Sequence, residues 1–195
     1  MRLKKICVFC ASSELCHVDY FKEAEKFGKI LAENDIELVY GGGGTGLMGA
    51  IANSVLKHKG IVTGVIPKFM MEREWGHKGV TELIETETMS QRKDLMLELS
   101  DAVVSLPGGC GTLEEILEAI LLKQVGKYLN PIILLNTRGF YDYFENLMNN
   151  CVEEKFMDGN HGRVWHSVNK SEEILEAIKN SPEWSEELGK LALLK

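Results

Sequence analysis

The 195-residue sequence predicts an α/β fold in which helices cover both faces of a doubly wound, parallel sheet. Short apolar runs alternate with longer segments whose apolar residues recur three and four positions apart, the spacing of an amphipathic helix. The apolar runs are continuous, which is typical of parallel strands buried on both faces. Right-handed crossovers then wind helices onto both faces. No linker, repeat or low-complexity segment interrupts the pattern, so residues 1–195 are expected to form a single domain.

In the first third of the chain, runs rich in Ile, Val, Leu and aromatic residues predict three strands. The segments between them have helical periodicity and are set off by glycine or charged residues. In chain order the prediction is a strand at 6–10, a helix at 19–33, a strand at 36–40, a helix at 46–59 and a strand at 61–66.

Pro67 follows the third strand, and a mixed, charged loop is expected to about Gly79. Beyond this loop, strands and helices continue to alternate. In a doubly wound fold, ligands bind at the carboxyl ends of the strands, so candidate site residues are expected in the loops there. The prediction is a strand at 81–87, a helix at 90–99, a strand at 101–106, a helix ending near Val125, a strand at 131–135, a helix at 139–154, a weak strand near Val164 and a helix at 172–179.

The charge balance argues against partners that carry many negative charges. With 22 Lys and Arg against 29 Asp and Glu, the net charge is −7, so neither a nucleic-acid surface nor an anionic membrane surface is expected. No apolar run is long enough to cross a membrane, and the apolar stretch after the basic start is too short for a signal peptide. Five cysteines, an odd number, disfavour a disulfide framework. These features predict a cytoplasmic protein.

The most informative segment is Pro-Gly-Gly-Cys-Gly-Thr-Leu-Glu-Glu at 107–115, between the strand at 101–106 and a helix. A glycine-rich turn at a helix start exposes backbone N–H groups that bind phosphate. Glu115 lies four residues beyond Gly111, about 6 Å along the helix. A phosphate at the helix start would therefore have this carboxylate one sugar ring away, which favours chemistry on a phosphorylated sugar. Cys110 lies inside the turn and is not assigned a catalytic role.

A second glycine-rich segment, Gly-Gly-Gly-Gly-Thr-Gly at 41–46, follows the second predicted strand and opens a helix. It has G-x-G-x-x-G spacing, but no acid stands at 65–68, where a dinucleotide fold would bind the ribose. No Lys-Ser or Lys-Thr pair follows it, so it is not a P-loop. Four consecutive glycines cost more conformational entropy than a simple turn requires. We therefore expect both glycine loops to approach one nucleotide at the same edge of the sheet.

Arg92 and Lys93 lie in the first turn of the helix at 90–99, where the helix dipole disfavours cations. Two interpretations remain open. The pair forms a solvated, charged surface, or it binds a phosphate or carboxylate, which Arg can do through two parallel N–H bonds. In the second interpretation, Arg92 would clamp the substrate or orient Glu115.

Cys7 and Cys10 have the spacing of a redox pair or half of a zinc site. They lie within a predicted strand, however, where an odd separation directs their side chains to opposite faces. No second pair of Cys or His residues completes a zinc site. No metal is expected.

Three motifs together resemble the "lonely guy" family of cytokinin riboside 5′-monophosphate phosphoribohydrolases, whose members were often labelled possible lysine decarboxylases. They are PGGxGTxxE at 107–115, the glycine loop at 41–49 and Met-x-x-Arg-Lys at 89–93. The resemblance extends from Ile6 to about Phe156. It implies a Rossmann-like fold, a homodimer or higher assembly and no required cofactor. It also implies hydrolysis of a nucleoside 5′-monophosphate to free base and ribose 5-phosphate.

The resemblance implies roles for individual residues as well. Arg92 and Glu115 match the catalytic arginine and glutamate of the family, and Lys93 belongs with Arg92 to a substrate-binding pair. Glu74 stands where an acid beyond the Ile-Pro pair contacts the substrate. The implied substrate-binding residues are Gly42, Gly43, Gly44, Thr45, Gly46, Glu74, Met89, Arg92, Lys93, Gly108, Gly109, Cys110, Gly111, Thr112 and Glu115.

Two departures from the family pattern leave the preferred base open. Ser90 stands where the family often has His, and Leu121-Leu122 where it often has Thr-Trp. Two other functions also remain. A nucleotide-binding sensor without turnover would keep the loops but would not need Glu115. A lysine decarboxylase would use pyridoxal phosphate on a Schiff-base lysine, and no lysine is marked for that role by its sequence context.

Overall fold

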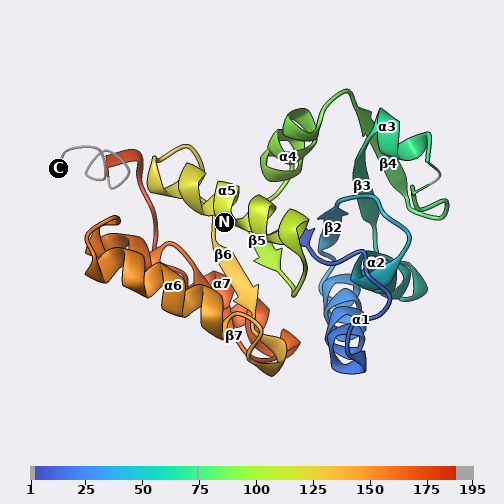
Figure 1. Ribbon diagram of the computed structural model, residues 1–195. Helices are drawn as coiled ribbons and strands as arrows, with labels where there is room; N and C mark the ends of the chain where they lie inside the picture. The colour runs from blue at the N-terminus through green and yellow to red at the C-terminus, as the bar shows by residue number, and fades with distance from the viewer. Residues whose placement is uncertain (1–2, 74, 188–195) are drawn as a thin grey trace.

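The computed structural model describes residues 3–73 and 75–187 (Figure 1). In this part of the chain, seven strands form one sheet in the order β4-β3-β2-β1-β5-β6-β7, and all neighbours are parallel. The predicted doubly wound α/β fold is confirmed. The strands are β1 (Lys5–Phe9), β2 (Glu37–Tyr40), β3 (Val62–Pro67), β4 (Glu82–Thr86), β5 (Ala102–Ser105), β6 (Ile132–Leu135) and β7 (His166–Val168).

Helices connect the strands and cover both faces of the sheet (Figure 1). The α-helices of the described residues are α1 (Val18–Glu33), α2 (Gly46–Lys57), α3 (Lys68–Met71), α4 (Met89–Glu98), α5 (Cys110–Gln124), α6 (Asp142–Glu153) and α7 (Ile174–Asn180). None of them is both long and apolar enough to cross a membrane.

Two hydrophobic cores lie on opposite faces of the sheet because side chains alternate along each strand. Helices α1, α2 and α7 pack on one core, and α4, α5 and α6 pack on the other. In β1, Ile6 and Val8 face the first core, and Cys7 and Phe9 face the second. Cys10 also packs in the first core, so the prediction that Cys7 and Cys10 face apart is confirmed.

The structure differs from the prediction in three loops. The short helix α3 occupies part of the expected loop, because four residues are too few for periodicity to reveal. Val164 lies at the end of the 3₁₀ helix Gly159–Arg163, and the strand is β7, two residues further on. Helix α6 begins at Asp142, since a 3₁₀ turn with Arg138 in the left-handed region (φ +59°) comes first.

The sheet order places a topological switch between β1 and β5. From β1 the chain adds strands outward through β2 and β3 to β4, and it then returns to the other side of β1 to add β5, β6 and β7. The loops after β1 and β5 therefore diverge at the carboxyl edge of the sheet. Ligands of doubly wound folds bind in the crevice that such a divergence opens.

Candidate active site

A cavity of about 580 Å³ opens at the carboxyl ends of the central strands. Its volume lies within the range of small-molecule sites, about 300–1,000 Å³. Because β1 lies between β2 and β5 in the sheet, the loops that follow β1, β2 and β5 meet around this cavity. The described residues that line it are 8–13, Gly41, Gly43, Thr45, Met48, Ile66, Met70, Trp75, Met89, Arg92, 109–112, Glu114 and Glu115.

The start of α5 brings free backbone N–H groups to this cavity. Cys110, Gly111 and Thr112 form the first turn and line the cavity. Gly109, at the N-cap, has no side chain to cap the helix, and no described residue accepts a hydrogen bond from these three N–H groups. Unpaired N–H groups at the positive end of a helix dipole bind anions. The predicted phosphate turn therefore has the geometry that its role requires.

The glycines of this turn differ in whether there is space for a side chain. A Cβ at Gly108 would lie 2.1 Å from Oγ1 of Thr112, so a side chain there would displace Thr112. A Cβ at Gly109 or Gly111 would meet no heavy atom within 4 Å. Packing does not demand glycine at these two exposed positions. Their small size keeps the approach to the N–H groups open.

Of the predicted substrate-binding residues in the first glycine loop, Gly43 and Thr45 line the cavity, and Gly42, Gly44 and Gly46 are not among the lining residues. Gly42 and Gly46 have φ values of +75° and +59°, which glycine adopts without steric cost. These two positions are explained by the conformation of the turn.

Three N–H groups in and directly after the first loop are used within the protein. The Gly44 N–H donates to the Trp75 carbonyl at 3.2 Å. The N–H groups of Leu47 and Met48, in the first turn of α2, both donate to the Ala11 carbonyl, at 2.9 and 3.3 Å. The start of α2 is therefore capped by the loop after β1, whereas the start of α5 is not.

Arg92 and Glu115 form a buried ion pair on the wall of the cavity. Arg92 Nη1 donates to Glu115 Oε1 at 2.6 Å, and the two side chains are 8% and 9% exposed. Arg92 Nε donates to the Val65 carbonyl, within β3, at 3.0 Å. A Cβ at Gly41 would lie 2.0 Å from Arg92 Nη2, so only glycine at that position leaves room for the guanidinium. Of the two interpretations of Arg92, the structure favours the one in which it orients Glu115.

The electrostatic setting of Glu115 combines burial with a nearby cation. Burial raises the pKa of the Glu115 carboxyl above its ordinary value of 4.5, and the charge and hydrogen bond of Arg92 oppose that rise. A carboxylate that is both desolvated and held by a guanidinium is oriented and poorly hydrated. These are properties of a group that stabilises charge or accepts a proton.

Lys93 makes a different set of contacts from Arg92. Its ammonium is bonded to Glu114 and lies 2.8 Å from Oε2 of Glu118, so it joins α4 to α5. Burial lowers the pKa of Lys93, but the hydrogen bonds that its ammonium donates to the two carboxylates outweigh this and raise the pKa, so Lys93 stays charged. Lys93 is not among the residues that line the cavity. Its predicted contact with substrate stays a prediction.

Comparison with known proteins identifies the family of the chain. The family model described as "Possible lysine decarboxylase" matches residues 48–178. A cytokinin riboside 5′-monophosphate phosphoribohydrolase of Arabidopsis thaliana is 40% identical over 179 residues, which cover 92% of this chain and 84% of the relative. Another, from Oryza sativa subsp. japonica, is 40% identical over 174 residues, which cover 89% and 72%. The chain belongs to this family.

Solved structures of more distant proteins share the fold. The molybdenum cofactor carrier protein of Chlamydomonas reinhardtii is 20% identical, with a TM-score of 0.70 over 91% of this chain and 97% of that protein. At this identity the likeness concerns the arrangement of strands and helices alone. The family membership rests on the sequence relatives, and the predicted resemblance to the lonely guy family is confirmed.

The remaining predicted site residues have different outcomes. Met89, at the start of α4, lines the cavity. Glu74 lies outside the described residues. Sequence reasoning did not select Ser12 and Ser13, which line the cavity after β1. A Ser-Ser pair behind a strand is common, and only the placement of β1 beside β5 brings it to the site.

The open space at Gly111 generates a prediction. Gly111→Ala should leave stability unchanged or raise it by up to about 1 kcal/mol, since alanine is the better helix residue and no atom is in its way. The same change should weaken binding of a nucleoside monophosphate, because the methyl group narrows the approach to the N–H groups. Thermal unfolding and calorimetric titration with AMP would measure both effects. Undiminished AMP affinity would contradict this account of the turn.

Proposed function

We propose that this protein hydrolyses the N-glycosidic bond of a nucleoside 5′-monophosphate, AMP or a cytokinin riboside monophosphate, to free base and ribose 5-phosphate. The observation that carries the proposal is the buried Arg92–Glu115 pair in the same cavity as the uncapped start of α5. A phosphate site and an oriented carboxylate about one helical turn apart fit a phosphorylated ribose. The relatives at 40% identity, named as phosphoribohydrolases, support this assignment.

Substrate binding divides between the two ends of the cavity. The phosphate lies at the N–H groups of the first turn of α5, where the helix dipole favours negative charge. The base lies against Ile66, Met70 and Trp75, which line the cavity near the end of β3. Since β3 lies three places from β5 in the sheet, this apolar wall is across the cavity from α5. Aromatic and methionine side chains pack well against a planar base.

The reaction breaks the bond between C1′ and the base nitrogen, and positive charge develops on the ribose. Glu115 stabilises this charge and accepts a proton from the attacking water, whose oxygen bonds to C1′. The departing base takes up a proton from solvent. Arg92 holds the carboxylate in place, and the phosphate contact converts binding energy into orientation of the ribose. The atoms of the reaction balance with water and substrate alone, so no cofactor is needed.

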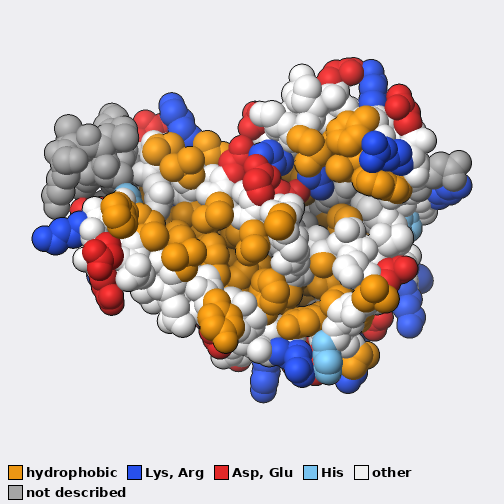
Figure 2. All heavy atoms as spheres, viewed as in Figure 1, with side chains coloured by type: hydrophobic (Ala, Val, Ile, Leu, Met, Phe, Trp, Pro, Cys, Tyr) orange, Lys and Arg blue, Asp and Glu red, His pale blue; other side chains and the backbone are white. Residues whose placement is uncertain are grey.

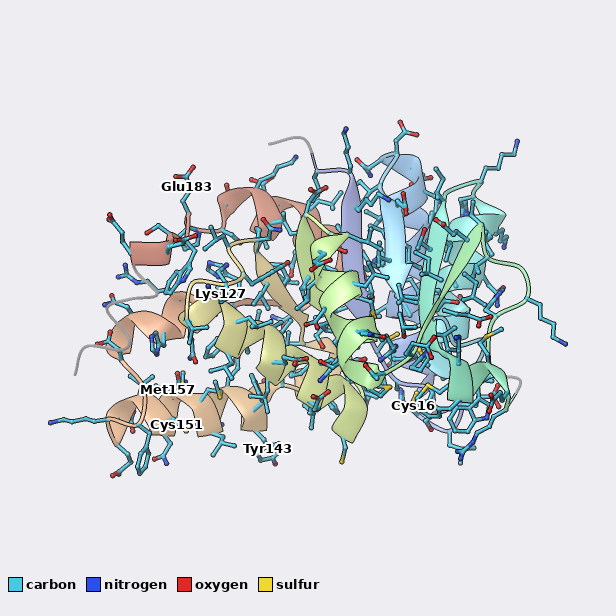
Figure 3. All side chains as sticks on the ribbon, turned by 90° about the horizontal axis from the view of Figure 1, so that it is seen from above. Cys16, Lys127, Tyr143, Cys151, Met157 and Glu183 are labelled. Carbon is cyan, nitrogen blue, oxygen red and sulfur yellow. The ribbon has the colours of Figure 1, made fainter. Side chains whose placement is uncertain are left out.

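We also propose that two copies of the chain associate through α5 and α6. Hydrophobic side chains gather over these helices in Figure 2. Leu117, Leu121, Tyr143 and Leu147 are 44–87% exposed, and Figure 3 shows Tyr143 pointing away from the sheet on the outer side of α6. An apolar face of this kind is typical of an interface, and two-fold pairing would cover it on both copies.

A cytoplasmic location is part of the same proposal. All five cysteines are free thiols, and Cys7 and Cys10 are buried in the cores. Unpaired thiols are typical of proteins that work in a reducing compartment.

The function is tested by adenine release from AMP. Glu115→Gln should lower kcat by at least roughly 100-fold, because it removes the base and the stabilising charge, while calorimetry should show that AMP still binds. Glu98→Gln, an exposed carboxylate on α4, is the matched control and should keep full turnover. Full turnover by Glu115→Gln would refute the catalytic assignment. No base release by the unmodified protein from any monophosphate would favour the sensor.

The pH profile of kcat/KM tests the ionised form of Glu115. Its pKa is raised above 4.5 by burial, so activity should fall on the acid side at a higher pH than for an ordinary glutamate. Arg92→Gln removes the charge and hydrogen bond that lower this pKa, so the acid limb should move to still higher pH. If activity falls at the same acidic pH in the unmodified protein and in Arg92→Gln, Arg92 does not lower the pKa of Glu115.

The proposed dimer is tested by molecular mass in solution. Leu121→Glu places a charge on the α5 face of both copies and should convert a dimer to a monomer. Leu15→Glu, at a residue 96% exposed outside α5 and α6, should leave the mass unchanged. A monomeric unmodified protein, or a dimer that survives Leu121→Glu, would exclude this interface.

A further inference from the structure

The carbonyl of Leu106 lies just before the phosphate turn and is held there by a hydrogen bond. Strand β5 ends at Ser105, and Leu106 still donates its N–H to the Phe9 carbonyl of β1, at 2.9 Å. Pro107 follows and has no N–H to donate, but its carbonyl accepts from the Ala11 N–H after β1, at 3.3 Å. Two residues, Pro107 and Gly108, separate Leu106 from the N-cap Gly109. The orientation of the Leu106 peptide therefore sets the direction in which the turn enters α5.

Tyr141 supplies the donor for this carbonyl from a distant part of the chain. Its hydroxyl donates to the Leu106 carbonyl at 2.9 Å and lies 2.7 Å from the Ser105 hydroxyl. Because the one phenolic proton goes to the carbonyl, Ser105 is the donor in the second bond. Ser105, Leu106 and Tyr141 have no exposed surface, so water cannot replace these bonds.

Tyr141 is itself held in place. Its N–H donates to Asn136 Oδ1 at 2.6 Å, and Asn136 Nδ2 donates to Asp142 Oδ1 at 2.8 Å. The ring makes edge contacts with Phe140 and Phe144, at centroid distances of 5.0 and 6.0 Å. Burial raises the pKa of the hydroxyl well above its ordinary value, so Tyr141 remains a neutral donor. The Tyr141 side chain is thus held in one position, and its hydroxyl stays protonated.

We propose that Tyr141 is a positioning residue for the phosphate turn: its hydroxyl, with that of Ser105, fixes the Leu106 carbonyl and so aims the N–H groups of α5 at the substrate phosphate. This inference rests on the proposed function, since it assigns the phosphate to that turn. Tyr141 does not line the cavity and touches no substrate. It acts through the backbone between residues 106 and 110.

The test separates phosphate binding from binding of the rest of the nucleotide. Tyr141→Phe removes one oxygen atom and keeps the ring. We expect it to raise the Kd for inorganic phosphate by roughly five- to tenfold, the effect of one buried hydrogen bond. The Kd for adenosine should stay within about twofold, because adenosine makes no contact with the turn. A general loss of structure would instead weaken both ligands together.

Tyr40→Phe is the matched control, since it removes the same atom from another buried tyrosine, whose hydroxyl has no hydrogen-bond partner among the described residues. Both Kd values should be unchanged in it. Ser105→Ala is the second variant, in case Tyr141→Phe does not fold. It removes the donor to Tyr141 and should weaken phosphate binding in the same direction but less.

Calorimetric titration of each folded variant with both ligands decides the matter. Unchanged phosphate affinity in Tyr141→Phe, or equal weakening of phosphate and adenosine, would overturn the inference. Failure of the proposed function is distinguishable. An unmodified protein that binds phosphate but releases no base would refute hydrolysis and leave the role of Tyr141 intact. One that releases base but binds no phosphate would overturn the role of Tyr141 and leave hydrolysis intact.

Discussion

The buried ion pair between Arg92 and Glu115 constrains the rest of the site. Removing two charges from water costs several kcal/mol for each ion, so the pair persists only with close contacts around it. Arg92 obtains them from Glu115 on α5 and from the Val65 carbonyl on β3. The pair therefore requires that α4 and α5 pack on the same face of the sheet. It also requires glycine at position 41, because the guanidinium occupies the space of a Cβ there.

The two glycine loops have similar sequences, but the backbone N–H groups at the helix starts that follow them differ in whether they have hydrogen-bond acceptors. Both follow a strand and open a helix at the same edge of the sheet. At α2, the Ala11 carbonyl accepts from two N–H groups of the first turn, so the helix start is closed by protein. At α5 the corresponding groups have no acceptor among the described residues. The difference is set by which loop packs on the helix start, and glycine content alone does not reveal it.

Much of the architecture could be predicted from the sequence, because apolar periodicity and glycine punctuation are local properties. The predicted strands through β6 and the predicted long helices agree with the structure to within a few residues. The sequence motifs also indicate Arg92, Glu115 and the turn at 109–112, all of which line the cavity. The contributions of Ser12 and Tyr141 could not be predicted. Each depends on a contact between segments far apart in the chain, and neither residue type is unusual where it stands.

All the described residues that line the cavity belong to the first 115 of the chain. Residues 116–187 contribute the rest of α5 and then β6, α6, β7 and α7, and none of them lines the cavity. Without them, β5 would become an edge strand with unpaired backbone groups, directly before the phosphate turn. The residues that line the cavity and the strands that flank β5 on its outer side thus belong to separate stretches of the chain. Tyr141, in the second stretch, reaches back to the end of β5 through its hydroxyl.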